Sequence, residues 1–383
     1  MKVTTHKLGL DWLVVANILL VCVYSPFIAE LTLIHLVSAG LSLVVVALAI
    51  VDILMHEKIR WYHLILIFGL IYLTIIVFVY VVAGSGINQL VRAYLPFFYL
   101  PSFALVCLCL NQTQARKLLK TLLFVGVIAS LAIIPFFVEL KLGRLPYNRF
   151  TAYTDLSHTP LFLMALPLCY CLLKSYRYLA VTIIMLAIFS TQSKGQILLS
   201  FLAIAMCEVF STRNRVMLLL KMVLIVIICS IPFFAYKDVI AKRFVDIGGS
   251  TTSHRLVEIQ AAGEIFQDKP LIGGGPTTKF DTTELVTNVD KEGQRYIHNL
   301  LMYVLATGGV VGCMFYFFPY LVIAIVKKSP EQKYILASLL CAFGYLLVSA
   351  TFKSIQTNMF FGVLLGCYAI FGGLGRNEHQ KTA

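Results

Sequence analysis

Apolar residues in this chain form long runs that are separated by short polar segments along almost its whole length. The runs are about 15 to 25 residues long, the length that an α-helix needs to cross a hydrocarbon core of about 30 Å. We therefore expect an all-α polytopic membrane protein of about 12 transmembrane helices, with residues 1–383 forming a single transmembrane domain. The expected spans are 9–25, 30–55, 61–82, 95–110, 118–138, 160–173, 178–191, 196–210, 215–235, 299–326, 333–350 and 357–375.

Positive charge collects in every second connection between these spans, as it does in the cytoplasmic loops of membrane proteins. This alternation predicts that both termini are cytoplasmic, and it accounts for most of the net charge of +13. No motif that combines basic and aromatic residues supports nucleic-acid binding. The basic residues expected on the cytoplasmic side are Lys58, Arg60, Arg116, Lys117, Lys174, Arg177, Arg213, Arg215, Lys327, Lys328, Lys333, Arg376 and Lys381.

Composition agrees with this interpretation, since 60% of the residues are hydrophobic, against roughly 45–50% in soluble domains. The ten cysteines all fall in apolar segments, which predicts neither a disulfide framework nor a metal site. No tight pair of carboxylates of the kind that holds a catalytic metal stands out on the periplasmic side. We therefore expect no metal and no cofactor.

One polar connection, residues 236–297 between the ninth and tenth spans, is much longer than the others and is expected in the periplasm. Loops of this length are usually functional. Apolar spacing over 255–266 predicts an amphipathic helix that lies against the bilayer, with Ser253 as its N-cap. Pro270 and the sequence Gly273-Gly-Gly-Pro276 predict a turn after this helix.

Several cations on the periplasmic side run against the charge bias and are candidates for function. Lys194 joins two apolar spans almost without a loop, so its ammonium is expected at the membrane interface, where ionisable groups are expensive. Arg255 opens the predicted helix, where its guanidinium and the backbone N–H groups suit phosphate. A snorkelling lysine and a solvated arginine are the alternative interpretations. Arg92 and Arg149 are second-tier candidates.

His298 lies where the long loop re-enters the membrane and is followed by Asn299 and a glycine-containing span. A neutral imidazole at this boundary can take a proton from a hydroxyl group near neutral pH. The alternative is a histidine that only anchors the chain through a hydrogen bond. His254, next to Arg255, is a second-tier candidate.

Three stretches together resemble the O-antigen ligase and polymerase superfamily of bacterial envelope glycosyltransferases. Thr191-Gln-Ser-Lys-Gly195 resembles the Ser-Arg-Gly turn of that family, with lysine in place of arginine. Ser253-His-Arg255, with the turn Pro270-Leu-Ile-Gly-Gly-Gly275, resembles its long-loop arginine segment. His298-Asn299, nine residues and then Gly309-Val-Val-Gly312 is similar to the ligase pattern of His-Asn, nine positions and Gly-x-x-Gly.

The resemblance implies a GT-C-like fold and a metal-independent, inverting transfer of a glycan from undecaprenyl diphosphate. It implies that Lys194 and Arg255 bind the pyrophosphate and that His298 is the catalytic base, with Asn299 and the glycines Gly309 and Gly312 as motif support. Lysine at position 194 keeps the charge of the family's arginine but lacks its bidentate fork.

The motif spacing favours an O-antigen ligase, which transfers the glycan to lipid A-core oligosaccharide at the periplasmic face of the bacterial inner membrane during lipopolysaccharide biosynthesis. An O-antigen polymerase, which transfers the glycan to another lipid-linked repeat, is the nearest alternative. A flippase or transporter of lipid-linked sugar is a second alternative, although it would favour charges at mid-membrane and repeat symmetry between halves, and the sequence has neither.

Overall fold

The structure of the protein is a computed structural model that describes residues 9–24, 32–56, 60–84, 87–144, 159–191, 193–212, 214, 216–221, 223, 227, 250–280, 297–320, 326, 329–349, 352 and 354–374. Over these residues the fold is all-helical, as the sequence predicts. The elements are α1 (Leu10–Tyr24), α2 (Thr32–His56), α3 (Trp61–Val82), α4 (Ile87–Leu108), α5 (Gln112–Lys141), α7 (Thr159–Leu172), α8 (Arg177–Thr191), α9 (Lys194–Ser211), α12 (Ser250–Asp268), α13 (Leu300–Phe317), η2 (Phe318–Tyr320), α15 (Gln332–Leu346), α16 (Ile355–Ala369) and η4 (Ile370–Leu374).

Several of these helices are suited to a membrane. In the described part of the chain, 5 helical segments are long and apolar enough to cross one, and shorter apolar helices accompany them. The predicted span 215–235 lies mostly outside the described residues, so the number of about 12 spans stays a prediction. The five segments are Val37–Met55, Trp61–Val82, Gln112–Leu140, Leu300–Tyr320 and Ile355–Leu374.

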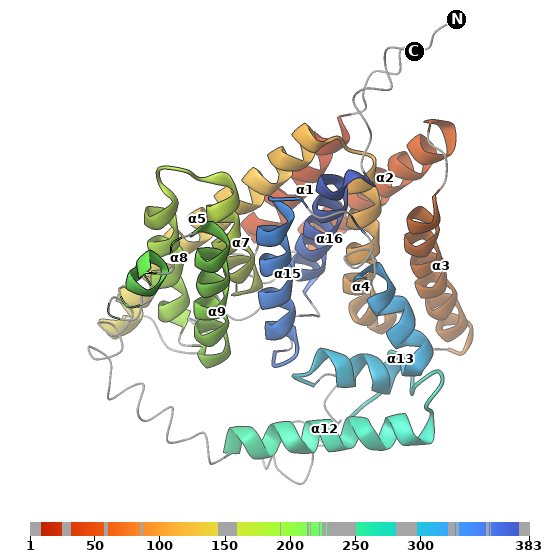
Figure 1. The fold of residues 1–383 in the computed structure, drawn as a ribbon. Helices are drawn as coiled ribbons and strands as arrows, with labels where there is room; N and C mark the ends of the chain where they lie inside the picture. Colours follow the sequence, from red (N-terminus) through yellow and green to blue (C-terminus); the bar gives the residue numbers. More distant parts are fainter. Residues whose placement is uncertain are drawn as a thin grey trace, which may run out of the picture.

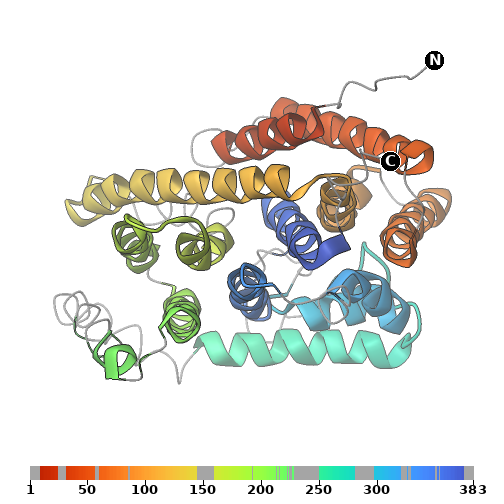
Figure 2. The same ribbon diagram turned by 45° about the horizontal axis from the view of Figure 1, so that its top comes forward.

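Helix α16 forms the centre of the bundle, where it is surrounded by α4, α5 and α15 (Figure 2). Every residue from Gln356 to Ala369 is buried, as expected of a helix that is apolar all round. Two glycines one turn apart, Gly362 and Gly366, face α4. A Cβ atom at Gly362 would lie 2.5 Å from the carbonyl oxygen of Leu100, and one at Gly366 would overlap the Cβ of Cys107. Small residues therefore let the two backbones approach closely.

Gly366→Ala is expected to destabilise the protein by about 1–3 kcal/mol, because the added methyl group overpacks the contact between α16 and α4. The measurement is the thermal unfolding midpoint of the purified protein in detergent. Gly40→Ala is the matched control, since a Cβ at Gly40 in α2 would meet no atom within 4 Å. Equal midpoints for the two variants would contradict close packing of α16 against α4.

Three of the basic residues predicted for the cytoplasm lie in contacts between different elements at one end of the described bundle. There Lys117 at the start of α5 forms an ion pair of 2.9 Å with Asp11 at the start of α1. Arg116 forms one of 3.3 Å with Glu331, which precedes α15. Lys333 in α15 donates a hydrogen bond of 2.8 Å to the carbonyl oxygen of Phe210 at the end of α9. The charge pattern thus identifies elements that lie together in the fold.

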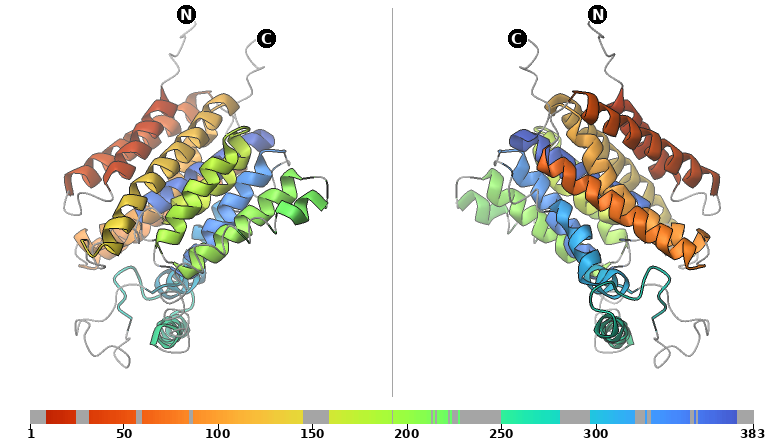
Figure 3. Two further views of the ribbon diagram at one scale, coloured as in Figure 1. Left: turned by 90° about the vertical axis from the view of Figure 1, so that its left-hand side faces the viewer. Right: turned by 90° about the vertical axis from the view of Figure 1, so that its right-hand side faces the viewer.

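Helix α12 lies across the opposite end of the bundle (Figure 1), and Figure 3 shows it end-on beneath the other helices. It begins at Ser250, so the prediction that Ser253 caps it is wrong. All four residues from Ser250 to Ser253 are Ser or Thr, residue types that suit an N-cap, but the helix already includes all of them. As a consequence Arg255 lies in the second turn of the helix, not in the first.

Candidate active site

Helix α13 is interrupted at the glycines of the predicted motif, so the expected continuous span 299–326 is broken (Figure 1). In an unbroken helix the N–H groups of Val310 and Val311 would bond to the carbonyls of Ala306 and Thr307. They bond instead to the carbonyls of residues 270 and 271, at 2.9 and 3.1 Å. The freed carbonyls of Ala306 and Thr307 accept from the N–H groups of residues 274 and 275, at 2.8 and 2.9 Å.

These four hydrogen bonds insert the turn after α12 into the gap in α13, and we call this arrangement the backbone joint. The facing backbone segments leave room only for glycine at positions 309 and 273. Gly309 has φ 61° and ψ −162°, a conformation essentially limited to glycine, and a Cβ there would overlap the carbonyl group of Leu271. A Cβ at Gly273 would lie 2.5 Å from the carbonyl carbon of Thr307. The glycines of two separate sequence motifs therefore meet in one structure.

Gly309→Ala is expected to open the backbone joint, because the substitution adds both a steric overlap and backbone strain of about 1–3 kcal/mol. The measurement is the rate of limited proteolysis between α12 and α13, which should rise. The matched control is Gly263→Ala within α12, where a Cβ would meet no atom within 4 Å. A cleavage rate unchanged from that of the native protein would show that the joint tolerates a side chain.

His298 is held at the entrance to α13 by its neighbours. Asn299 is the N-cap of the helix, and its side-chain oxygen accepts a hydrogen bond of 3.0 Å from the N–H of Met302. This local capping explains why asparagine follows the histidine. The ring of His298 is 38% exposed, so it lies at the surface of the site and not in the protein interior.

A carboxylate on α12 binds His298 through two different groups. Glu258 Oε2 accepts a hydrogen bond of 2.9 Å from the backbone N–H of His298, and Oε1 lies 2.9 Å from the ring nitrogen Nδ1. The Glu258 side chain is only 8% exposed. Glu258 was not predicted as a site residue, because a single carboxylate in a long polar loop gives no signal of its own. The available signal was its position three residues after Arg255, which places both on one face of a helix.

Arg255 lies near the turn that contains Lys194. The Arg255 guanidinium donates a hydrogen bond to the carbonyl oxygen of Val348, just beyond the C-terminal end of α15. A Cβ at Gly195 would lie 3.4 Å from the side chain of the same valine. Arg255 and Gly195, the residue after Lys194, therefore both lie next to Val348, although they are far apart in the sequence.

The turn around Lys194 is itself ordered by hydrogen bonds. Ser193 is the N-cap of α9, so Lys194 is the first residue of that helix and lies at its positive end. The hydroxyl of Thr191 lies 2.9 Å from the buried side-chain oxygen of Gln196 and bridges the two helices. Ser193 Oγ lies 3.5 Å from the hydroxyl of Tyr345 in α15. A helix N-terminus with an adjacent cation is suited to bind an anion.

The remaining predicted site residues are less well placed by the structure. Arg92 lies inside α4, not in a connection after the third span, because α4 begins earlier than expected at Ile87. The side chains of Arg92, Lys194 and His254 are outside what the structure describes, and so is the whole of Arg149. Their proposed roles are therefore predictions.

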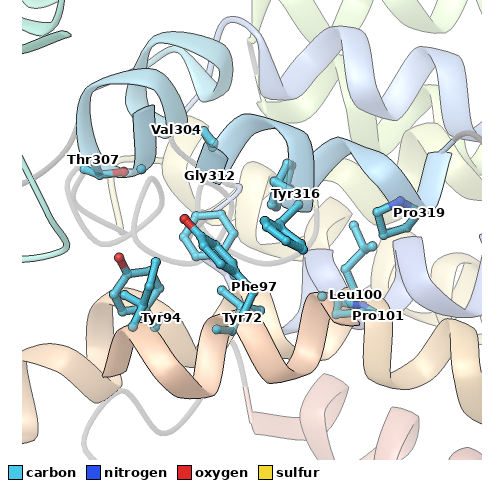
Figure 4. A pocket seen from close by; sticks show the side chains of 15 residues that line it. Tyr72, Tyr94, Phe97, Leu100, Pro101, Val304, Thr307, Gly312, Tyr316 and Pro319 are labelled. Atoms are coloured by element: carbon cyan, nitrogen blue, oxygen red, sulfur yellow. The ribbon is translucent and has the colours of Figure 1, made fainter. Parts of the chain in front are cut away.

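An apolar pocket lies alongside α13, between that helix and α3 and α4 (Figure 4). Aromatic side chains form much of its wall, and three of them are tyrosines. Thr307, Gly308 and Gly312 border it, so the pocket reaches the backbone joint. Its aromatic lining consists of Tyr72, Tyr94, Phe97, Phe315 and Tyr316.

Fold and site together define a multi-helical membrane protein with a histidine, a carboxylate and cationic positions at one end of its bundle. The sequence model of a protein family described as O-Antigen ligase matches residues 179–317, which include His298, Glu258 and Arg255. Residues 179–317 are thus similar to the O-antigen ligase family, in agreement with the resemblance of the motifs. No curated protein matches the sequence. The family supports a ligase or polymerase type of function and a glycosyltransferase-like enzymatic role.

Proposed function

We propose that this protein is an O-antigen ligase, which transfers a glycan from undecaprenyl diphosphate to lipid A-core oligosaccharide at the periplasmic face of the inner membrane. The observation that carries the proposal is the convergence of its motifs. The backbone joint and the Glu258–His298 contact bring the arginine helix to the histidine, and Val348 links Arg255 to the turn of Lys194. Four sequence-distant segments therefore contribute to one end of the bundle.

The proposed reaction is a single displacement. An acceptor hydroxyl gives its proton to His298 while its oxygen forms a bond to the anomeric carbon of the glycan. The bond between that carbon and the diphosphate breaks, and undecaprenyl diphosphate leaves with the electron pair. Attack from the face opposite the leaving group inverts the configuration. Negative charge grows on the diphosphate, and Arg255 and Lys194 stabilise it.

The apolar pocket could hold part of the lipid donor. Helix α3 forms part of its wall, and Phe78 and Val82 near the end of this helix are 67% and 71% exposed, as suits a surface that faces the bilayer. An isoprenoid chain can exchange the bilayer interior for such an apolar surface, whereas a water-soluble donor would gain nothing from it. The pocket also reaches the backbone joint, which is near the proposed site of transfer.

Lipopolysaccharide from a strain that lacks this protein tests the proposal on a gel. Complete loss of O-antigen from the core is expected for a ligase, and the native sequence should restore the ladder. Core that carries a single repeat would identify a polymerase instead. Accumulation of the lipid-linked glycan on the cytoplasmic leaflet would identify a flippase and would contradict both transferase functions.

A further inference from the structure

Glu258 contacts His298 but has no role in the proposed transfer reaction. Both of its carboxylate oxygens are engaged by His298, one by the backbone N–H at 2.9 Å and one by ring atom Nδ1 at 2.9 Å. The side chain is 8% exposed, and α12 holds it within a buried face that also includes Ala261 and Ala262. A carboxylate in such a position is costly to bury unless its oxygens are hydrogen-bonded.

The chemistry of the contact fixes the ring. An ionised carboxylate only accepts hydrogen bonds, so the Nδ1 atom that faces it must carry a proton. In neutral imidazole the lone pair then lies on Nε2, the nitrogen on the opposite side of the ring. The second hydrogen bond, to the main chain of His298, fixes the backbone from which the ring extends. Rotation and tautomer are thus controlled by one side chain.

We propose that Glu258 is the positioning residue of the catalytic base: it holds His298 as the Nδ1–H tautomer, so that Nε2 takes the acceptor proton, and it stabilises the imidazolium that forms. The inference rests on the proposed role of His298 as the base. The same division of labour between a carboxylate and a histidine occurs in hydrolases of unrelated fold, where the carboxylate does not itself accept the proton.

The position of Glu258 on α12 gives the contact a second effect. Arg255 and Glu258 are three residues apart and lie on one face of this helix. Arg255 contacts Val348, just beyond α15, while Glu258 contacts His298, just before α13. One rigid helix therefore sets the separation between the proposed diphosphate-binding group and the proposed base, and the backbone joint fixes the end of that helix.

Glu258→Gln tests the positioning role with little change in shape. The amide can still accept the bond from the His298 N–H, but its NH₂ group donates to Nδ1 and so favours the opposite tautomer. We expect kcat for transfer to fall by about 10² to 10⁴, the range of positioned proton transfer, while KM for the lipid-linked donor is unchanged. Glu258→Asp should recover part of kcat. Glu264→Gln is the matched control, because Glu264 is on the same helix and contacts Gln260 at the surface.

Two further measurements distinguish failure of the inference from failure of the proposed function. In a His298→Ala background, Glu258→Gln should cause no additional loss, since a positioning residue acts only through the ring. Nitrogen-15 spectra of histidine-labelled protein in nanodiscs, assigned with His298→Ala, should place the neutral-form proton on Nδ1 in the native protein and on Nε2 in Glu258→Gln. This readout does not require activity.

The possible results distinguish failure of the positioning role from failure of the proposed base. An inactive His298→Ala with a fully active Glu258→Gln would overturn the positioning role and leave the base in place. An active His298→Ala would overturn the base itself. A native protein whose neutral His298 carries its proton on Nε2 would overturn the positioning role whatever the activity shows.

Discussion

His298→Ala is expected to lower the rate of glycan transfer by a factor of about 10² to 10⁴, the usual contribution of a positioned proton transfer. The substitution removes the ring and keeps the main chain, so the hydrogen bond from the backbone N–H to Glu258 can persist. The Asn299 cap of α13 does not depend on the ring either. The protein should therefore insert normally and still bind undecaprenyl diphosphate, which is measured by binding of that lipid in nanodiscs.

Amide variants at the same position separate a base from an anchor. The side chain of His298→Gln can donate a hydrogen bond to Glu258 in place of Nδ1, but an amide cannot take a proton from a hydroxyl at neutral pH. We expect His298→Gln and His298→Asn to be nearly inactive when lipopolysaccharide ladders are compared at matched expression. A native ladder from His298→Gln would remove the catalytic role and leave only an anchoring contact.

Arg255→Ala is expected to abolish transfer at an unchanged protein level. The diphosphate gains negative charge as its bond to the sugar breaks, and a guanidinium in a partly desolvated site contributes several kcal/mol to that state through charge-assisted hydrogen bonds. In the structure Arg255 donates a hydrogen bond to the carbonyl of Val348, so loss of the side chain also removes its contact with the segment just after α15. Transfer is measured with purified protein and lipid-linked donor.

Two variants keep this prediction specific. Arg255→Lys retains the charge without the bidentate fork and should have intermediate activity. Arg144→Ala is the matched control, because the 3.6 Å ion pair of Arg144 with Glu139 is exposed and such pairs contribute little. Native activity in Arg255→Ala would exclude this residue from binding of the leaving group. An equal loss in Arg144→Ala would indicate a general effect of surface charge.

Local sequence patterns were sufficient to predict most of the helices. Long apolar runs coincide with α2, α3 and α5. The thickness of the hydrocarbon core sets the number of consecutive apolar residues in a membrane-crossing helix, so the run itself shows where the helix lies. Two basic residues predicted for the cytoplasmic side form ion pairs with other elements, Lys117 with Asp11 and Arg116 with Glu331, while the orientation itself stays a prediction. The prediction that Ser253 is the N-cap of α12 was wrong, because the helix already includes Ser253 and the three Ser and Thr residues before it.

The contacts within the candidate site could not be predicted from local patterns, because they join residues that are far apart in the sequence. Glu258 and His298 are 40 residues apart, and neither apolar spacing nor charge alternation indicates that a particular carboxylate faces a particular ring. The break in α13 was also missed. Glycines within an apolar span are compatible with a continuous helix, and only the partner segment after α12 shows that the hydrogen-bond ladder is opened at Gly309.

The backbone joint requires its glycines but not particular side chains at positions 271 and 272. Its four hydrogen bonds use only main-chain atoms, so they make no demand on the side chains of Leu271 and Ile272, which are 66% and 67% exposed. A new residue at either position leaves the frame of the site intact as long as the glycines remain. Substitutions on the outer surface of this turn should therefore leave the spacing between Arg255 and His298 unchanged.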